Sequence, residues 1–133
     1  MTRLEIKLLN FGNALERLKE AVVEYRDNSK PSLNGLLRDG IIQRFEFTYE
    51  LAWKAAKAYL EEMGITDKTS PRSVIREAYA QLLITDEANW LLMLNDRNLT
   101  SHVYSEEIAV EISERIMNIY LDEFERLWLE LST

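Results

Sequence analysis

The sequence predicts an all-α protein with a single domain over residues 1–133. We expect an up-and-down antiparallel bundle that is four-helix-bundle-like and carries additional short helices. Apolar residues recur at alternating steps of three and four along most of the chain, which is the period of an amphipathic helix. Clusters of Pro, Gly, Asn and Ser separate these periodic stretches. No stretch combines strand-type alternation with turn residues, and the length suits one compact domain.

The first half of the chain predicts two long helices. The first is expected over about residues 4–25, where the apolar stripe consists of Leu4, Leu8, Phe11, Leu15, Leu18, Val22 and Tyr25. Residues 26–35 have the composition of a loop, and the second helix is expected over about residues 36–63, before Gly64. Two adjoining apolar stripes cover this second helix. We therefore expect it to contact both its own core and a further surface, which favours a homodimer.

The second half of the chain predicts three more helices, each with a recognisable start. Ser70 and Pro71 suit the cap and first turn of a short helix that is expected to end near residue 83. Thr85 or Asp86 caps the next helix, which is expected to end near residue 98. Ser105 caps the last helix, and acidic residues follow it in the first turn, where they are stabilising. The apolar stripe of this last helix is Ile108, Ile112, Ile116, Tyr120, Phe124, Leu127 and Leu131.

The composition disfavours several classes of function. The formal net charge is −7, and an acidic chain repels phosphate backbones at long range, so any chemistry on nucleic acid must rest on few residues or on a partner. The chain has no cysteine, hence no disulfide and no thiolate metal site, which fits a reducing cytoplasm. The N-terminus lacks the apolar core of a signal peptide, and the apolar run WLLML at 90–94 is too short to cross a bilayer. We expect a cytoplasmic protein with no membrane partner.

The stretch RNLTSHVY, residues 97–104, holds the only histidine. Arg97 and His102 are five residues apart, which on an ideal helix is about 140° around the axis, so they would not share a face. They can converge if the helix ends near Asn98, because an extended passage places Thr100, His102 and Tyr104 on one side. One interpretation is metal-free RNA cleavage by the RNA's own 2′-hydroxyl. A guanidinium would bind the phosphate and an imidazole would move the proton. The other is structural: Arg97 satisfies the last carbonyls of a helix, and the two rings pack.

Glu46 and Glu50 lie one turn apart on the second predicted helix, where like charges repel unless they are compensated. Glu50 has Lys54 one turn later in the favourable order, whereas Glu46 has no such partner. One carboxylate is expected to face Arg97 or Arg44 across the bundle and to orient it. The alternative is a solvated or ion-paired face. Because no further histidine or aspartate cluster accompanies the pair, we expect neither a metal site nor a bound cofactor.

A third stretch, SPRSVIREAY at residues 70–79, places Arg72 and Arg76 one turn apart. A solvated face is the simpler interpretation, and contact with a phosphate or an acidic partner is the alternative. The tryptophans Trp53, Trp90 and Trp128 follow helical spacing and are expected in the core rather than as platforms that stack on a ligand.

Together these stretches resemble the nucleotidyltransferase substrate-binding protein family, a branch of the HEPN superfamily that includes the HepT-like toxins of MNT/HEPN toxin–antitoxin pairs. The strongest matches are DGIIQRFEFTYELAWK, SPRSVIREA and DRNLTSHVY, and the resemblance covers essentially the whole chain. Arg97, Asn98 and His102 fill the HEPN signature, and Tyr104 completes the R-x4-H-x-Y form of the toxin branch.

The resemblance implies a helical bundle that dimerises and so brings two R-x4-H motifs to a shared cleft. Arg97 would then hold phosphate, Asn98 would orient, and His102 would transfer the proton. It also implies a small, separately encoded nucleotidyltransferase partner, to which ATP and Mg²⁺ would belong. This partner would adenylylate Tyr104 and so block RNA.

Three hypotheses about function follow. The first is a metal-independent HEPN endoribonuclease toxin that a cognate minimal nucleotidyltransferase antitoxin neutralises. The second is a non-catalytic substrate-binding subunit of a two-component nucleotidyltransferase, which the net acidity favours. The third is a dimerisation module in which residues 97–104 are inert.

Overall fold

A computed structural model of the chain describes residues 1–102 and 105–133, with the side chains of residues 101 and 102 outside that description. The described residues form helices without any strand, so the predicted all-α class is confirmed. The elements are α1 (Arg3–Asp27), the 3-10 turn η1 (Pro31–Leu33), α2 (Asn34–Glu62), α3 (Pro71–Ala80), α4 (Glu87–His102), α5 (Glu106–Arg115), the π-helical turn η2 (Ile116–Tyr120) and α6 (Leu121–Ser132).

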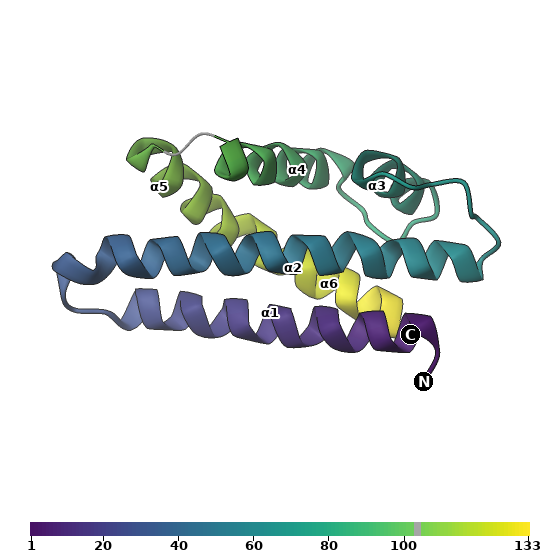
Figure 1. Cartoon of the computed structure of the whole chain (residues 1–133), viewed down its shortest axis with the longest axis horizontal. Coiled ribbons are helices and arrows are strands. Elements are labelled where there is room, and N and C mark those ends of the chain that lie inside the picture. The colour runs from purple at the N-terminus through teal and green to yellow at the C-terminus, as the bar shows by residue number, and fades with distance from the viewer. Residues whose placement is uncertain (103–104) are drawn as a thin grey trace.

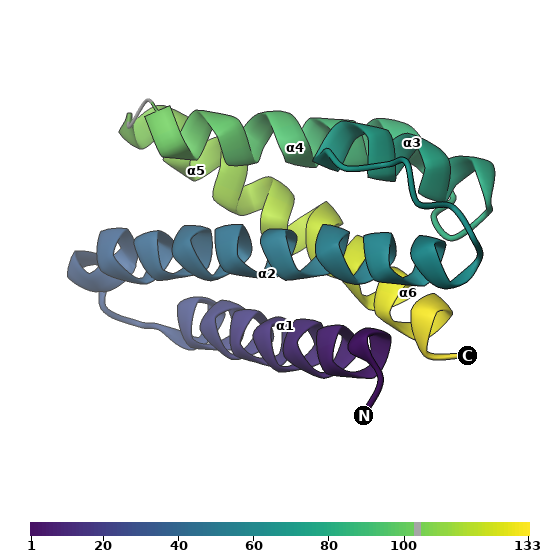
Figure 2. The same ribbon diagram turned by 45° about the vertical axis from the view of Figure 1, so that its right-hand side comes forward.

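Helix α2 occupies the middle of the molecule (Figures 1 and 2). Helix α1 runs antiparallel along one side of α2, and α3 and α4 lie on the other side. The continuous path from α5 through η2 to α6 crosses α2 obliquely and brings the C-terminus to the same end as the N-terminus. This is the up-and-down arrangement that the sequence predicts, with α3 as the additional short helix.

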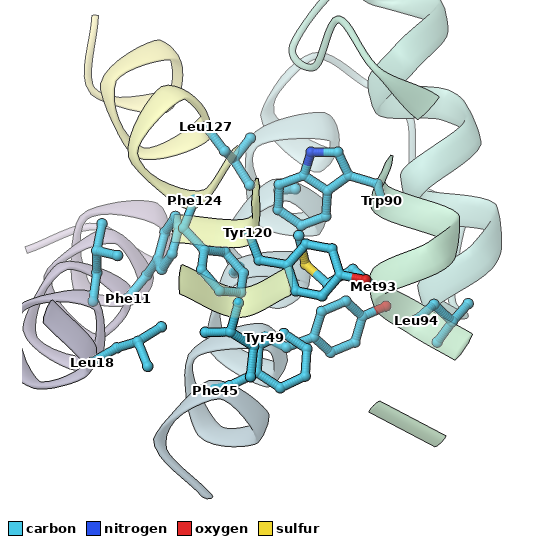
Figure 3. Packing of buried hydrophobic residues seen from close by; sticks show 14 of the residues in the cluster. Phe11, Leu18, Phe45, Tyr49, Trp90, Met93, Leu94, Tyr120, Phe124 and Leu127 are labelled. Carbon is cyan, nitrogen blue, oxygen red and sulfur yellow. The ribbon is translucent and has the colours of Figure 1, made fainter. Parts of the chain in front are cut away.

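The core combines aliphatic side chains with aromatic ones from α1, α2, α4, η2 and α6 (Figure 3). Phe45 stacks on Tyr120 with ring centroids 5.5 Å apart, and Trp90 meets Phe124 edge-on at 5.8 Å. Such geometries add to the free energy gained from burying the rings. Trp90 is buried as expected, while Trp53 and Trp128 are partly buried against the same cluster.

The central position of α2 explains its wide apolar face. The second of its two apolar stripes lies largely inside the monomer, because α2 packs against α1, α3, α5 and α6. This stripe consists of Ile42, Tyr49, Trp53, Ala56, Leu60 and Met63. Ile42, Tyr49, Ala56 and Leu60 of that stripe are buried, and only Met63 at its end is exposed. The width of this face is therefore not evidence for a dimer.

The helix starts follow the predicted caps. Ser70 accepts a hydrogen bond from the backbone N–H of Ser73, and Pro71 opens α3. Asp86 accepts one from the N–H of Asn89, and Ser105 accepts one from that of Ile108. These bonds satisfy N–H groups that the first helical turn leaves without a partner.

The helix ends differ more from the predictions. Gly64 has φ of +89°, the left-handed conformation expected of it. Helix α3 ends at Ala80 rather than near residue 83, because Leu82 also adopts a left-handed φ of +63°. Helix α4 continues to His102 rather than ending near Asn98. The predicted 26–35 loop is shorter as well, since α1 extends to Asp27 and η1 precedes α2.

The π-helical turn η2 is the feature of the last helix that the sequence analysis missed. From Ile108 to Phe124 the apolar stripe repeats at every fourth residue. In a regular α-helix each such step drifts about 40° around the axis. A π turn contains more residues per turn and so corrects this drift. Ile112, Ile116 and Tyr120 are accordingly all fully buried with Phe124.

No helix in the described part of the chain is both long enough and apolar enough to cross a membrane.

Candidate functional site

The backbone of His102 belongs to α4, as does that of Arg97. This corrects the expectation of a helix end near Asn98 followed by an extended passage. Because the helix continues, backbone positions 97 and 102 lie about 140° apart around its axis. Within one chain these two positions therefore belong to different faces of α4. Tyr104 and the side chain of His102 lie outside the described residues.

Arg97 is bound to Glu50 across the interface between α4 and α2. Its Nη2 lies 3.2 Å from Oε1 of Glu50, and the Arg97 side chain is 28% exposed. The other carboxylate oxygen of Glu50 accepts a hydrogen bond from Nε1 of Trp53 at 3.3 Å and lies 3.9 Å from Nζ of Lys54. Glu50 is thus the carboxylate that faces Arg97. These contacts fix the direction in which the guanidinium projects.

A buried phenol lies behind this ion pair. Tyr49 is fully buried, and within the described part of the chain its hydroxyl has no hydrogen-bond partner. Burial raises the pKa of Tyr49 above its ordinary value, and the charge of Glu50 raises it further. Arg97 and Arg72 act in the opposite direction, because their positive charges favour the ionised phenol.

The residue before Arg97 anchors α4 to the opposite side of the bundle. Asp96 is 1% exposed and accepts two hydrogen bonds from Arg115 and one from the hydroxyl of Tyr120. The bond to Asp96 raises the pKa of Arg115, and burial followed by the same carboxylate raises that of Tyr120. The sequence analysis missed this cluster. A carboxylate at a core-facing position of α4 was the available signal, but nothing in the sequence paired it with Arg115.

A cavity of about 180 Å³ lies one helical turn away from the Arg97–Glu50 pair, between α2, α4 and α5. Glu46, one turn before Glu50, lines this cavity, and so does Thr100, three residues after Arg97. The two glutamates are therefore separated in role: Glu50 faces Arg97, and Glu46 faces the cavity.

The remaining predicted site residue, Asn98, is exposed on α4, and no hydrogen bond of its side chain joins it to Arg97 among the described residues. Within residues 1–102 and 105–133, no three acidic, histidine or cysteine side chains are placed to hold a metal ion together. Arg44, the other candidate partner for a glutamate, donates instead to the backbone carbonyl of Arg17 at 2.7 Å.

The helical bundle and the Arg-x4-His motif on α4 agree with the resemblance of the sequence to the HEPN type. Residues 6–133 match the model of the family described as nucleotidyltransferase substrate binding protein like, and the chain belongs to this family.

Two relatives support this assignment, and a third structure shares the fold. A Haemophilus influenzae protein named Probable ribonuclease HepT is 33% identical over 118 residues, which is 82% of this chain and 81% of the relative. A Haemophilus influenzae structure described as a substrate binding domain of a nucleotidyltransferase is 31% identical, with a TM-score of 0.86, and the match covers 95% of this chain and 99% of that one. A tri-AMPylated Shewanella oneidensis HEPN toxin, solved in complex with MNT antitoxin, shares the fold at 21% identity. Its TM-score is 0.78, with 99% and 98% coverage.

Proposed function

We propose that this chain is a metal-independent endoribonuclease of the HEPN type, neutralised by a cognate minimal nucleotidyltransferase. The observation that carries the proposal is the Arg97–Glu50 ion pair at the α2–α4 interface, on the helix that bears the R-x4-H motif. The relative named Probable ribonuclease HepT supports the activity. The complex of a HEPN toxin with MNT antitoxin supports the class of partner.

The chemistry needs one cation and one proton-transfer group. The 2′-oxygen of RNA forms a bond to the adjacent phosphorus and gives up its proton, while the 5′-oxygen leaves and takes up a proton. The products are a 2′,3′-cyclic phosphate and a 5′-hydroxyl end. Arg97 stabilises the charge on the phosphate oxygens, and His102 moves the proton. The nucleophile is part of the substrate, so we expect the reaction to proceed without a divalent ion.

The continuation of α4 to His102 favours a shared site. Because backbone positions 97 and 102 lie about 140° apart around one helix, a phosphate is held more readily between two chains than within one. Two chains that place their motifs in one cleft supply an arginine and a histidine from different helices. The homodimer is thus part of the proposed mechanism.

Inactivation is proposed at Tyr104. The nucleotidyltransferase would use ATP, and the Tyr104 oxygen would attack the α-phosphorus as pyrophosphate leaves and the phenolic proton is lost. The attached AMP adds bulk and negative charge two residues from His102. The AMPylated state of the Shewanella oneidensis toxin supports this modification.

The test is cleavage of a labelled RNA pool in EDTA by the unmodified protein, whose mass is checked for attached AMP. We expect products with cyclic phosphate ends from the parent and none from the Arg97→Ala/His102→Ala variant. Arg76→Ala, which removes an exposed arginine of α3, is the matched control and should cleave like the parent. Equal cleavage by parent and double variant would refute the proposal.

A second candidate is a non-catalytic substrate-binding subunit of a two-component nucleotidyltransferase. The observation that favours it is the net charge of −7, which leaves little positive charge for RNA. It predicts a stable complex with the nucleotidyltransferase and intact RNA in the assay above. Cleavage that depends on Arg97 and His102 would exclude it.

A further inference from the structure

We propose that the cavity between α2, α4 and α5 is a nucleobase subsite that selects guanine, next to the phosphate position at Arg97. This inference deepens the proposed function, on which it rests for the identity of the phosphate group. It assigns a role to Glu46, which the cleavage chemistry leaves unused.

The position of the cavity fits one nucleotide. Glu46 lies one turn from Glu50 on α2, and Thr100 lies about one turn from Arg97 on α4, in the same direction along the two antiparallel helices. One turn is about 5.4 Å, the scale of the separation between a phosphate and its own base. A nucleotide with its phosphate at Arg97 can therefore place its base in the cavity.

The cavity is small, and its volume of about 180 Å³ is below the roughly 300 Å³ at which pockets for drug-sized ligands begin. Ile42, Ile108 and Ile112 line it, and of these Ile108 is only partly buried. A flat heteroaromatic ring that covers Ile108 gains free energy because it removes apolar surface from water.

Among the described residues, the rim of the cavity offers hydrogen-bond acceptors. Glu46 contributes a carboxylate, and Gln43 contributes an amide. The hydroxyl of Thr100 already donates to the carbonyl of Arg97 at 2.9 Å, so it faces a ligand as an acceptor. The hydroxyl of Ser105 accepts the backbone N–H of Ile108. The carboxylate of Glu46 repels a phosphate and accepts hydrogen bonds, so it favours a ligand group that carries N–H donors.

Guanine is the base that meets this requirement best. Its N1–H and N2 amino group lie side by side and can both donate to one carboxylate, a charge-assisted two-point contact. Adenine and cytosine offer an amino group without an adjacent ring N–H. Uracil has one N–H, which lies between two carbonyl groups. A carboxylate repels both carbonyl oxygens. Glu46, four residues from the phosphate-orienting Glu50 and without an ion pair among the described residues, is the group we assign to guanine.

The test begins with binding, so that it does not depend on cleavage. The 3′-monophosphates of guanosine, adenosine, cytidine and uridine are titrated separately into the full-length protein and followed by calorimetry. We expect guanosine 3′-monophosphate to bind about tenfold more tightly than the other three. In Glu46→Gln, which keeps the shape but replaces one acceptor oxygen with a donor, this preference should fall below about twofold. Glu62→Gln, at the exposed end of α2, should retain it.

The Arg97→Ala variant distinguishes binding of the base from binding of the phosphate. It should weaken the binding of all four nucleotides alike and leave the preference for guanosine intact. Mapping cut sites in a random RNA pool then tests the same selectivity in the reaction. Equal binding of the four nucleotides, no binding because a second chain covers the cavity, or a preference unchanged in Glu46→Gln would each overturn the subsite. Arg97-dependent cleavage would still stand in those cases. Guanine-selective binding without any cleavage would instead keep the subsite and reject the ribonuclease.

Discussion

Arg115 binds Asp96 through two hydrogen bonds, with Nε 2.8 Å from Oδ2 and Nη2 2.9 Å from Oδ1. Asp96 directly precedes Arg97, and Tyr120 donates to it as well. The pair therefore joins α4 to the α5–η2 segment beside the residue that we propose to bind phosphate. Because a helix is rigid over one residue, this anchor also fixes the direction of Arg97.

The first prediction concerns this anchor. Asp96→Asn should lower the free energy of unfolding by about 2 kcal/mol, because it removes the charge that Arg115 and the buried Tyr120 hydroxyl bind. The loss is smaller than for a fully buried pair, since the Arg115 side chain is 29% exposed. Urea denaturation measures it. The exposed Asp122→Asn should change the free energy by less than about 0.5 kcal/mol. Equal losses in the two variants would contradict the anchor.

The second prediction concerns Glu50. If Glu50 orients Arg97, Glu50→Gln should slow single-turnover RNA cleavage about tenfold, because a misplaced cation stabilises the transition state less well. Its unfolding midpoint should stay close to that of the parent, since the ion pair is partly exposed. Glu62→Gln is the control on the same helix. A faster reaction in Glu50→Gln would show that Glu50 competes with phosphate rather than orienting Arg97.

The third prediction compares two helical glycines. A Cβ added at Gly12 would lie 2.8 Å from Nε1 of Trp128, the atom that donates to the carbonyl of Leu8. Gly12→Ala should therefore lower the free energy of unfolding by about 1–3 kcal/mol, although alanine is the better helix former. At Gly40, inside α2, an added Cβ meets nothing within 4 Å. Gly40→Ala should raise that free energy by about 0.5–1 kcal/mol. Thermal unfolding of both variants tests the pair, and destabilisation by both would contradict it.

The fourth prediction concerns the buried Glu123, which is 4% exposed. Burial raises the pKa of its carboxyl, and Asp86 and Asp122 raise it further, while the Asn89 amide and Arg126 lower it. The folded state therefore holds this proton more tightly than the unfolded state. The resulting stability is complete below the ordinary pKa of a glutamate and is lost as the pH rises through the folded pKa.

Glutamine resembles the protonated carboxyl, so Glu123→Gln should escape this loss. We expect the variant to melt at a higher temperature than the parent at pH 7, and the two curves to converge as the pH falls below the ordinary glutamate pKa. Glu130→Gln, an exposed position on α6, should follow the parent at every pH. If Glu123→Gln is less stable than the parent at pH 7, the contacts of the Glu123 carboxylate with Asn89 and Arg126 contribute more to stability than the burial of its charge costs.

Much of the fold could be predicted from local signals. Helices start where hydrogen-bonding or ring chemistry predicts, at Ser70, Pro71, Asp86 and Ser105. Gly64 adopts the positive φ that few other residues tolerate. The end of α4 was not predictable in this way. No glycine or proline stops the chain after residue 98, so the helix runs on to His102. The proposed shared site depends on this difference, because it sets the angle between backbone positions 97 and 102 around α4.

The sequence by itself determined the helical class, the order of the elements and the motif residues, because periodicity, caps and the R-x4-H spacing are properties of neighbours along the chain. Only the tertiary structure decided which carboxylate meets which cation. The sequence left open which of Glu46 and Glu50 faces a cation across the bundle, and the packing of α2 against α4 gives Arg97 to Glu50 and the cavity to Glu46. Asp96 and Arg115 are 19 residues apart and meet because α5 and η2 fold back onto α4. Such pairings depend on the geometry of packed helices, which the periodicity of any single helix does not contain.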